Sequence, residues 1–223
     1  MSLLKDCKLT YFRIAGRGEA TRLALSIGGV EFIDERIAFP AWKELKPKTP
    51  WGSLPILTLS NGTTVAQQRA ILRFVGKETG LYPTDSIAAA KVDELMDVGE
   101  DIGARAFKAG QGLDQEAKEA ARKEACAPGG SIHEILSKID KTVASNAASS
   151  FAVGTNLTVA DLFLYCSCNN LVSGLYDGVP AEALNEFENL MNLRKAVRSH
   201  PSVCKWYDGL DSSVKVPSSY GLL

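Results

Sequence analysis

The sequence predicts a chain of two domains, a mixed α/β domain followed by an all-α domain. Two observations lead to this prediction. Up to Gly80, short segments with the composition of β-strands alternate with segments of helical periodicity, whereas from Ser86 onward the apolar residues recur only at helical spacing. We therefore expect a first domain over residues 1–82, a linker over residues 83–87 and a helical domain over residues 88–223.

The first domain is expected to begin with a β-α-β unit. A strand is predicted over residues 8–12, a helix over residues 19–27 that two glycines end, and a second strand over residues 31–37. Residues 39–49, rich in Trp, Lys and Pro, are predicted to form a loop or a short helix. A right-handed crossover and a following β-β-α unit would give a small mixed sheet with helices on its faces.

The stretch over residues 51–74 is expected to supply that β-β-α unit. A short apolar run after Pro55 suits a buried strand, and a proline belongs at the start or edge of a strand because it cannot donate to a sheet ladder. Asn61-Gly62 is typical of a two-residue hairpin loop. From Ala66 the residues favour a helix that ends near Gly80. The apolar face expected for this helix is Ala70, Ile71, Phe74 and Val75.

The second domain is expected to be a helical bundle. Helices are predicted over residues 88–109, 113–127, 131–144, 158–171, 181–198 and 202–209. The helix over residues 158–171 is nearly all apolar, so it should be the central one. Thr158 and Asp161 have the spacing of a capping box directly before this apolar run, and we interpret the pair as a folding element rather than a chemical one.

Composition and charge exclude several classes of function. The net charge is −1, with 25 basic and 26 acidic side chains, which does not favour nucleic acid or an anionic membrane as a partner. No apolar run approaches the roughly 20 residues of a membrane helix, and the N-terminus lacks the apolar core of a signal peptide. The cysteines are odd in number and scattered, which favours free thiols and a cytoplasmic setting. They are Cys7, Cys126, Cys166, Cys168 and Cys204.

The spacing of potential metal ligands does not predict a metal site. The two histidines, His133 and His200, lie far apart, and no Cys/His spacing resembles a zinc site. Cys166 and Cys168 are one residue apart in an apolar helical run, so they point to different faces and are expected to pack in the core.

Two residues near the first strand are candidates for chemistry. Tyr11 lies near the end of that strand, where a phenol could donate a hydrogen bond to a bound thiolate and so lower the pKa of the thiol. A free thiol has a pKa near 8.5, so a shift of about 1.5 to 2 units would make the thiolate dominant at pH 7. Arg17 follows in the turn before the helix. Taken alone, Tyr11 is better explained as a core or surface aromatic and Arg17 as a solvated charge.

The same turn lacks a residue that dithiol chemistry would need. A thioredoxin-type redox enzyme has a cysteine after its first strand, but residues 12–16 contain none. If this domain binds a thiol, the nucleophile must therefore come from the ligand.

A second set of candidates could bind an anion or a peptide backbone. Gln67 and Gln68 are expected in the first turn of a helix, where unpaired N–H groups and the helix dipole favour anions. Trp42 and Lys46 are four residues apart and would share a face if their segment is helical. Each of these features also has a purely structural explanation. The stretch before Gln67 could be a surface hairpin that leads into an ordinary helix, Trp42 could be a packing aromatic, and Lys46 could be a solvated lysine.

These segments together resemble a known family. The chain is similar to the cytosolic glutathione transferases, most of all to the sigma class, in the same order and spacing over nearly its whole length. The matching segments are KLTYFRIAGRGEATRLAL (8–25), WKELKPKTPWGSLPIL (42–57), QQRAI (67–71), VDELMDVGED (92–101), LTVAD (157–161) and the closing HPSVxxW (200–206). The resemblance implies a thioredoxin-like N-terminal domain, an all-helical C-terminal domain and a homodimer.

The resemblance also implies a role for each candidate residue. Tyr11 would stabilise the glutathione thiolate with Arg17 as its electrostatic helper, and Leu54, before a cis Pro55, would pair with the cysteinyl part through its backbone. The remaining glutathione contacts implied are Trp42, Lys46 and Ser53 at the glycyl carboxylate, Gln67 and Gln68 at the γ-glutamyl end, and Asp101, with Glu100 beside it, reaching the γ-glutamyl amine across the dimer interface. Candidate residues for the wall of a second-substrate pocket, expected between the sheet domain and the first long helix of the second domain, are Phe12, Arg13, Gly103, Ala104, Phe107 and Lys108.

Two positions depart from the family pattern. Gln68 stands where the family usually has Ser or Thr, and a glutamine must fold back to donate to the same carboxylate. Ser53 stands where sigma members often carry Lys, which leaves Lys46 as the cation near the glycyl carboxylate. Both departures put the geometry and affinity of the pocket in question, but neither removes Tyr11.

The activity implied is transfer of glutathione, activated as its thiolate, to hydrophobic electrophiles in detoxification, with glutathione as co-substrate and neither cofactor nor metal. Two alternatives stay open. One is a glutathione-dependent isomerase like the prostaglandin synthases of the sigma class, whose metal cluster the acidic triplet Asp97, Glu100 and Asp101 resembles. The other is a transferase-like carrier or structural protein with little catalysis.

Overall fold

The computed structural model describes residues 3–146, 149–211, 214 and 216–221, and these divide into two compact units. Residues up to Pro83, together with those from Ser199 to Val216, form the first. Those from Thr84 to Arg198, together with the segment that starts at Pro217, form the second. The sequence predicted a helical domain over residues 88–223, whereas the segment Ser199–Val216 belongs to the unit that contains the sheet.

The first unit is built on a mixed sheet in the order β2-β1-β3-β4. Its strands are β1 (Lys8–Phe12), β2 (Ile33–Ile37), β3 (Ile56–Thr58) and β4 (Thr64–Ala66). β1 pairs parallel with β2 and antiparallel with β3, which pairs antiparallel with β4. The parallel pair needs a crossover connection, and α1 supplies it. The predicted thioredoxin-like fold is confirmed.

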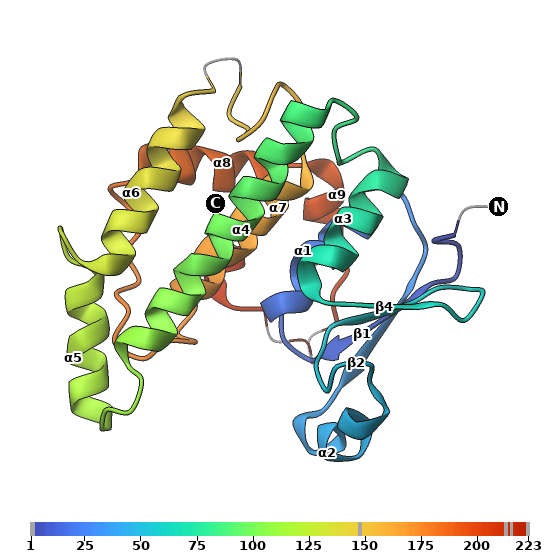
Figure 1. Ribbon diagram of the computed structural model, residues 1–223, viewed down its shortest axis with the longest axis horizontal. Coiled ribbons are helices and arrows are strands. Elements are labelled where there is room, and N and C mark those ends of the chain that lie inside the picture. The colour runs from blue at the N-terminus through green and yellow to red at the C-terminus, as the bar shows by residue number, and fades with distance from the viewer. Residues whose placement is uncertain (1–2, 147–148, 212–213, 215, 222–223) are drawn as a thin grey trace. The chain divides into compact units, whose positions relative to one another are not determined.

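Helices cover the sheet of this unit. They are η1 (Gly16–Gly18), α1 (Glu19–Ile27), η2 (Phe39–Ala41), α2 (Trp42–Leu45), η3 (Lys46–Lys48), α3 (Gln68–Thr79) and α9 (Pro201–Asp208). α1 packs against α3 and also against α9, where the Ser26 hydroxyl donates to the Ser202 carbonyl at 3.3 Å. Figure 1 shows α1 and α3 side by side, with α2 away from them beyond the sheet.

Two details of the stretch over residues 51–74 differ from expectation. The hairpin loop has three residues, Ser60 to Gly62, because Leu59 and Thr63 still pair, with Leu59 N–H donating to the Thr63 carbonyl at 2.8 Å. Gly62 has φ 85°, the left-handed conformation that closes such a loop. Helix α3 begins at Gln68 rather than Ala66, and its buried face is Ile71, Leu72, Val75 and Gly76, one residue beyond part of the predicted face.

The described part of the second unit contains helices joined by turns and loops but no strand, as predicted. Its helices are α4 (Ser86–Ala109), α5 (Gln115–Cys126), α6 (Ser131–Ala144), α7 (Val159–Leu171), α8 (Glu188–Arg198) and η4 (Ser218–Tyr220). α7 packs against α4 and α8, and in Figure 1 it lies behind α4. Cys166 and Cys168 on α7 are buried, which confirms them as core residues, and all five cysteines are free thiols. None of the described helices is long and apolar enough to cross a membrane.

One predicted helix starts seven residues later than expected. Residues 181–186 form turns, and α8 begins at Glu188. The Asp140 carboxylate, from α6, accepts the Leu190 N–H at 2.9 Å and the Asn189 amide at 2.9 Å. A side chain distant in sequence thus satisfies the first turn of α8, in the place of a local cap.

The predicted capping box at the start of α7 is present and larger than expected. Asp161 is fully buried. Its Oδ2 accepts the Thr158 N–H at 2.7 Å and the Thr158 hydroxyl at 2.9 Å, while its Oδ1 accepts the Ala152 N–H at 2.7 Å. The box therefore ties the preceding loop to the central helix.

We expect Asp161→Ala to lower the free energy of unfolding by about 2–6 kcal/mol, because two buried N–H groups lose their acceptor at about 1–3 kcal/mol each. Asp114→Ala is the matched control: Asp114 caps α5 through the Ala117 N–H at an exposed site and should cost only about 1 kcal/mol. Urea unfolding followed by circular dichroism measures both. Equal losses in the two variants would contradict the structural role given to Asp161.

Candidate functional site

Three of the predicted site residues lie in a row across neighbouring strands. In the register of the sheet, Thr10 of β1 pairs with Ile56 of β3, which pairs with Ala66 of β4. Because each of these pairs is antiparallel, the next position along is Tyr11 on β1, Pro55 before β3 and Gln67 after β4. The sheet thus brings together a phenol, a proline-led backbone edge and a helix start. The Leu54–Pro55 bond is cis, as the resemblance implied.

Tyr11 presents a neutral hydroxyl group with an unused hydrogen. The residue is 6% exposed, and its oxygen accepts the Arg17 N–H at 3.0 Å. Burial raises the pKa of the phenol, outweighing that hydrogen bond and the charges of Arg17 and Arg22, so Tyr11 stays protonated at neutral pH. No acceptor for its hydroxyl hydrogen occurs among the residues that the structure describes. Tyr11 can therefore donate to an external anion but cannot serve as a base.

The turn that follows Tyr11 is held by a buried arginine that the sequence analysis did not single out. Arg22 of α1 is fully buried. Its guanidinium donates to the carbonyls of Phe12, Ile14 and Ala15 at 2.9–3.3 Å, so it binds almost every residue between Tyr11 and Gly16.

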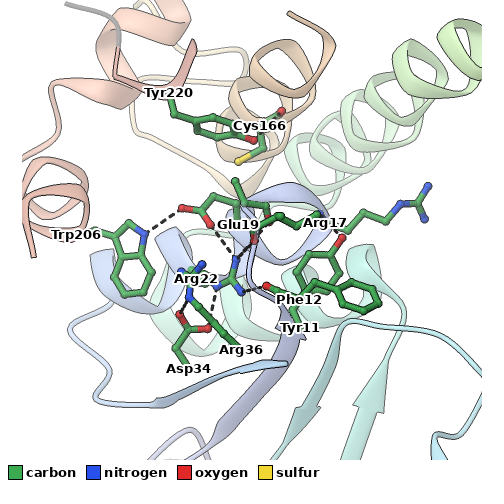
Figure 2. Close-up of polar contacts among 12 residues, drawn as sticks. Tyr11, Phe12, Arg17, Glu19, Arg22, Asp34, Arg36, Cys166, Trp206 and Tyr220 are labelled. Atoms are coloured by element: carbon green, nitrogen blue, oxygen red, sulfur yellow. Dashed lines mark hydrogen bonds and ion pairs between the residues drawn. The ribbon is translucent and has the colours of Figure 1, made fainter. Parts of the chain in front are cut away.

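Two carboxylates compensate the Arg22 charge. Glu19 is 3.0 Å from Arg22 Nη1, and Asp34 of β2 is 2.9 Å from Nε. Burial alone would lower the pKa of Arg22, but the two carboxylates outweigh it and raise the pKa. Glu19 in turn accepts the Trp206 indole N–H at 3.0 Å, so Figure 2 shows its carboxylate between Trp206 and Arg22. A Glu–Arg pair three residues apart on the apolar face of a helix was the signal in the sequence.

The residues that the resemblance implies for the glycyl carboxylate of glutathione lie in α2 and in the segment after it. Trp42 opens α2, and the Lys46 N–H donates back to its carbonyl, so the two are one helical turn apart. The Phe12 ring stacks on Phe39 and meets Trp42 edge-on, with centroids 4.6 and 5.8 Å apart. The Lys46 side chain is exposed and runs beside Gly52, next to Ser53. An aromatic cluster therefore connects the end of β1 to α2.

The two glutamines differ in position from the prediction. Gln67 lies before α3, not in its first turn. Its φ is 75°, a backbone conformation that residues other than glycine rarely adopt. Gln68 is the first residue of α3 and is half-buried. Outliers of this kind cluster at ligand sites, and the N-terminus of α3 follows directly.

The other predicted residues belong to the two units separately. Phe12 and Arg13 follow Tyr11, whereas Asp101, Gly103, Ala104, Phe107 and Lys108 lie on α4 of the second unit. There Asp101, Ala104 and Lys108 line a pocket of about 570 Å³. The described residues contain no group of three or more His, Cys, Asp or Glu side chains placed to hold a metal ion.

The first unit thus has a thioredoxin-like sheet that carries a phenol, and no cysteine, at the end of its first strand. Comparisons with known proteins identify this class more closely. Residues 103–209 match the family described as "Glutathione S-transferase, C-terminal domain". Glutathione S-transferase 1 of Ascaris suum is 34% identical over 202 residues, 89% of this chain and 94% of that protein. The chain belongs to the glutathione S-transferase family and is similar to its sigma class.

The relatives carry different functional names. S-crystallin 3 of Enteroctopus dofleini is 26% identical over 89% of this chain and 94% of its own length. Hematopoietic prostaglandin D synthase of Gallus gallus is 27% identical over 91% of this chain and 96% of its own length. Among solved structures, the glutathione S-transferase of Ascaris lumbricoides superimposes with a TM-score of 0.79 at 32% identity, covering 93% of this chain and 99% of that one.

Proposed function

We propose that the chain binds glutathione and catalyses attack of its thiolate on electrophilic small molecules. The observation that carries this proposal is the Tyr11 hydroxyl, protonated, anchored by the Arg17 N–H and left with one hydrogen to donate. In the reaction the glutathione thiol loses its proton to solvent, and Tyr11 donates to the resulting thiolate. The sulfur then forms a bond to the electrophilic carbon, and a halide leaves or an enone carbon takes up a proton.

The row of strand ends supports a way of holding the tripeptide beside Tyr11. Leu54, next to the cis proline, offers backbone groups at a sheet end for the cysteinyl part. Gln67 and Gln68, at the N-terminus of α3, face the γ-glutamyl carboxylate in this proposal, because unpaired N–H groups there favour an anion. Trp42 and Lys46 take the glycyl end. Asp101 of a second copy would reach the γ-glutamyl amine in a homodimer.

Binding to immobilised glutathione, followed by the rate of conjugation to 1-chloro-2,4-dinitrobenzene, tests the proposal. We expect retention on the matrix, elution by free glutathione, and saturable turnover. Failure to bind glutathione would overturn the proposal as a whole. Binding without turnover on this or an enone substrate would favour a carrier function, for which the identity to an S-crystallin is the supporting observation.

A glutathione-dependent isomerase is the second candidate, because a relative named prostaglandin D synthase is 27% identical over 91% of this chain. Incubation with a prostaglandin endoperoxide and glutathione, with product analysis by mass spectrometry, separates the two. An isomeric product with glutathione recovered unchanged supports isomerisation, whereas a thioether adduct supports conjugation.

Gly16→Ala should greatly reduce this activity. Gly16 has φ 44°, and an added Cβ would lie 2.8 Å from the Tyr11 oxygen. The methyl group would displace the phenol, and misplacement by about 1 Å can cost on the order of 100-fold in rate. The measurement is kcat/KM for conjugation.

Gly29→Ala is the matched control for Gly16→Ala. Gly29 has φ 65°, but nothing lies within 4 Å of the position of its Cβ. Both variants bear a similar backbone cost of about 1 kcal/mol in the left-handed region. If the two lost activity equally, backbone strain rather than contact with Tyr11 would be the cause.

A further inference from the structure

The second unit contains a cavity, separate from the predicted glutathione residues, that is rich in cations. Its volume is about 280 Å³, and it lies among side chains of α7, α8 and η4. Arg194, Lys195 and Arg198 of α8 line it, and none of the described residues that line it is acidic. Lys195 and Arg198 also suit the C-terminal end of a helix, where cations favour the dipole. That explanation does not account for Arg194, because its side chain is buried.

Arg194 is a buried cation, and all of its acceptors among the described residues are uncharged. The residue is 6% exposed, and its Nε and Nη2 donate to Asn169 Oδ1 at 3.1 and 2.7 Å. Nη2 also donates to the Ser219 carbonyl at 3.3 Å. In the described part of the chain Nη1 has only the Met191 thioether sulfur at 2.8 Å, a weak acceptor.

No carboxylate lies within ion-pair distance of Arg194 in the described part of the chain. The Asp140 carboxylate, from the neighbouring helix α6, is bonded to Asn189 and Leu190 instead. Buried charges in proteins are normally paired, because an unpaired one is costly. Arg22 in the first unit, which has two carboxylates, shows the usual arrangement.

A second donor in the same cavity lacks a partner. Asn169 is fully buried and lines the cavity. Because its Oδ1 accepts two bonds from Arg194, the orientation of the amide is fixed, and Nδ2 remains without an acceptor among the described residues. Buried polar atoms without a partner are few in native proteins, and each calls for an explanation. Arg194 and Asn169 together form a pair of donors that lack an anionic acceptor.

The remaining lining suits an apolar body attached to that anion. Tyr165 and Tyr220 meet edge-on with ring centroids 5.7 Å apart. Their hydroxyl groups are engaged, Tyr165 with the Tyr220 carbonyl at 3.0 Å and Tyr220 with Asn170 Oδ1 at 2.9 Å, so the rings present carbon surface to the cavity. Met191 adds an adaptable apolar side chain.

We propose that this cavity is a binding site for a small organic carboxylate with an apolar body, independent of the glutathione site. The carboxylate pairs with Arg194 Nη1 and Asn169 Nδ2, and the apolar part lies against Tyr165, Tyr220 and Met191. Lys195 and Arg198 add positive potential. Binding here would also stabilise the unit by supplying the missing counter-charge.

The test is calorimetric titration of the full chain, saturated with S-methylglutathione, with 2-naphthoate and with its uncharged analogue 2-naphthamide. We expect one equivalent of naphthoate to bind and to raise the Tm, and naphthamide to bind at least about tenfold more weakly, since a hydrogen bond to a charged group contributes about 1.5–3 kcal/mol. Equal binding of the two compounds, or no binding of naphthoate, would overturn the proposal. So would release of bound naphthoate by glutathione.

Variants locate the site. Arg194→Met should weaken naphthoate binding about tenfold or more, and circular dichroism checks that the variant folds. Lys195→Gln/Arg198→Gln changes more exposed residues and should weaken binding about threefold to tenfold, even if Arg194→Met fails to fold. Lys123→Gln, an exposed cation on α5, is the matched control and should change nothing. Naphthoate affinity unchanged in the Lys195/Arg198 variant and in a folded Arg194 variant would contradict the assignment.

Discussion

Replacement of Tyr11 by Phe is expected to lower kcat/KM for glutathione conjugation by about 10- to 100-fold while the Kd of glutathione changes little. The substitution removes one hydrogen bond to a thiolate, which contributes about 1.5–3 kcal/mol. The tripeptide keeps its other proposed contacts at Leu54, Gln67 and Gln68. Steady-state rates with 1-chloro-2,4-dinitrobenzene and calorimetric titration with glutathione measure the two quantities.

The pH profile distinguishes this role from a merely structural one. In the wild type the rate should rise with an apparent pKa below that of a free thiol, near 8.5, and in Tyr11→Phe that pKa should return towards 8.5. Burial raises the pKa of Tyr11 itself, so the donor stays protonated and the wild-type plateau should continue past pH 10. The direction follows because only the protonated phenol can donate. A fall in rate below pH 10 would contradict it.

Tyr82→Phe is the matched control, since Tyr82 is a half-buried tyrosine outside the predicted site. It should keep both the rate and the pH profile of the wild type. If Tyr11→Phe behaved in the same way, the thiolate would have to be stabilised elsewhere, and Arg17 would be the next residue to change.

Replacement of Arg22 by Met is expected to lower the free energy of unfolding and the conjugation rate together. It leaves Glu19, which is 1% exposed, without its cation, and breaking a buried ion pair from one side costs about 3–5 kcal/mol. The carbonyls of Phe12, Ile14 and Ala15 lose their donor at the same time. Urea unfolding should show the loss, and the conjugation rate should fall even at temperatures where the variant is folded.

Two further variants test the cause of this loss. Arg22→Met/Glu19→Gln removes the unpaired charge and should recover part of the stability, because Gln can still accept from Trp206. Lys91→Met breaks the exposed pair with Glu94 and should change stability by less than about 1 kcal/mol. A double variant no more stable than Arg22→Met would show that the charge of Glu19 is not the reason.

Much of the fold could be predicted because its elements carry local patterns. The strand at Lys8–Phe12 and the helix at Glu19–Ile27 have the predicted bounds, since apolar periodicity and a glycine pair define them. The late start of α8 could not be predicted, because Asp140 on another helix supplies its N-terminal acceptor. The three-residue hairpin loop was missed because Asn-Gly indicates a turn without fixing how many residues close it.

The individual residues of the site could be predicted, but the tertiary contacts that position them could not. Tyr11 and Pro55 matched a family pattern, and the register of the sheet places them in one row with Gln67. The φ of Gln67, the contact of Arg22 with Asp34 and the contact of Glu19 with Trp206 depend on tertiary structure. Nor did any short motif relate Asn169 to Arg194, which come together only when α7 packs on α8.

The discontinuity of the first unit has a consequence for biosynthesis. A ribosome releases residues up to Pro83 long before Ser199 to Val216, yet these segments form one compact unit. Until then, Glu19 has no indole donor and the α9-facing side of α1 is uncovered. The surface of the first unit that α9 covers therefore stays exposed to solvent while the helical unit is translated. We expect a fragment that ends at Pro83 to be less stable than the complete unit. Its exposed apolar surface would favour binding by a chaperone.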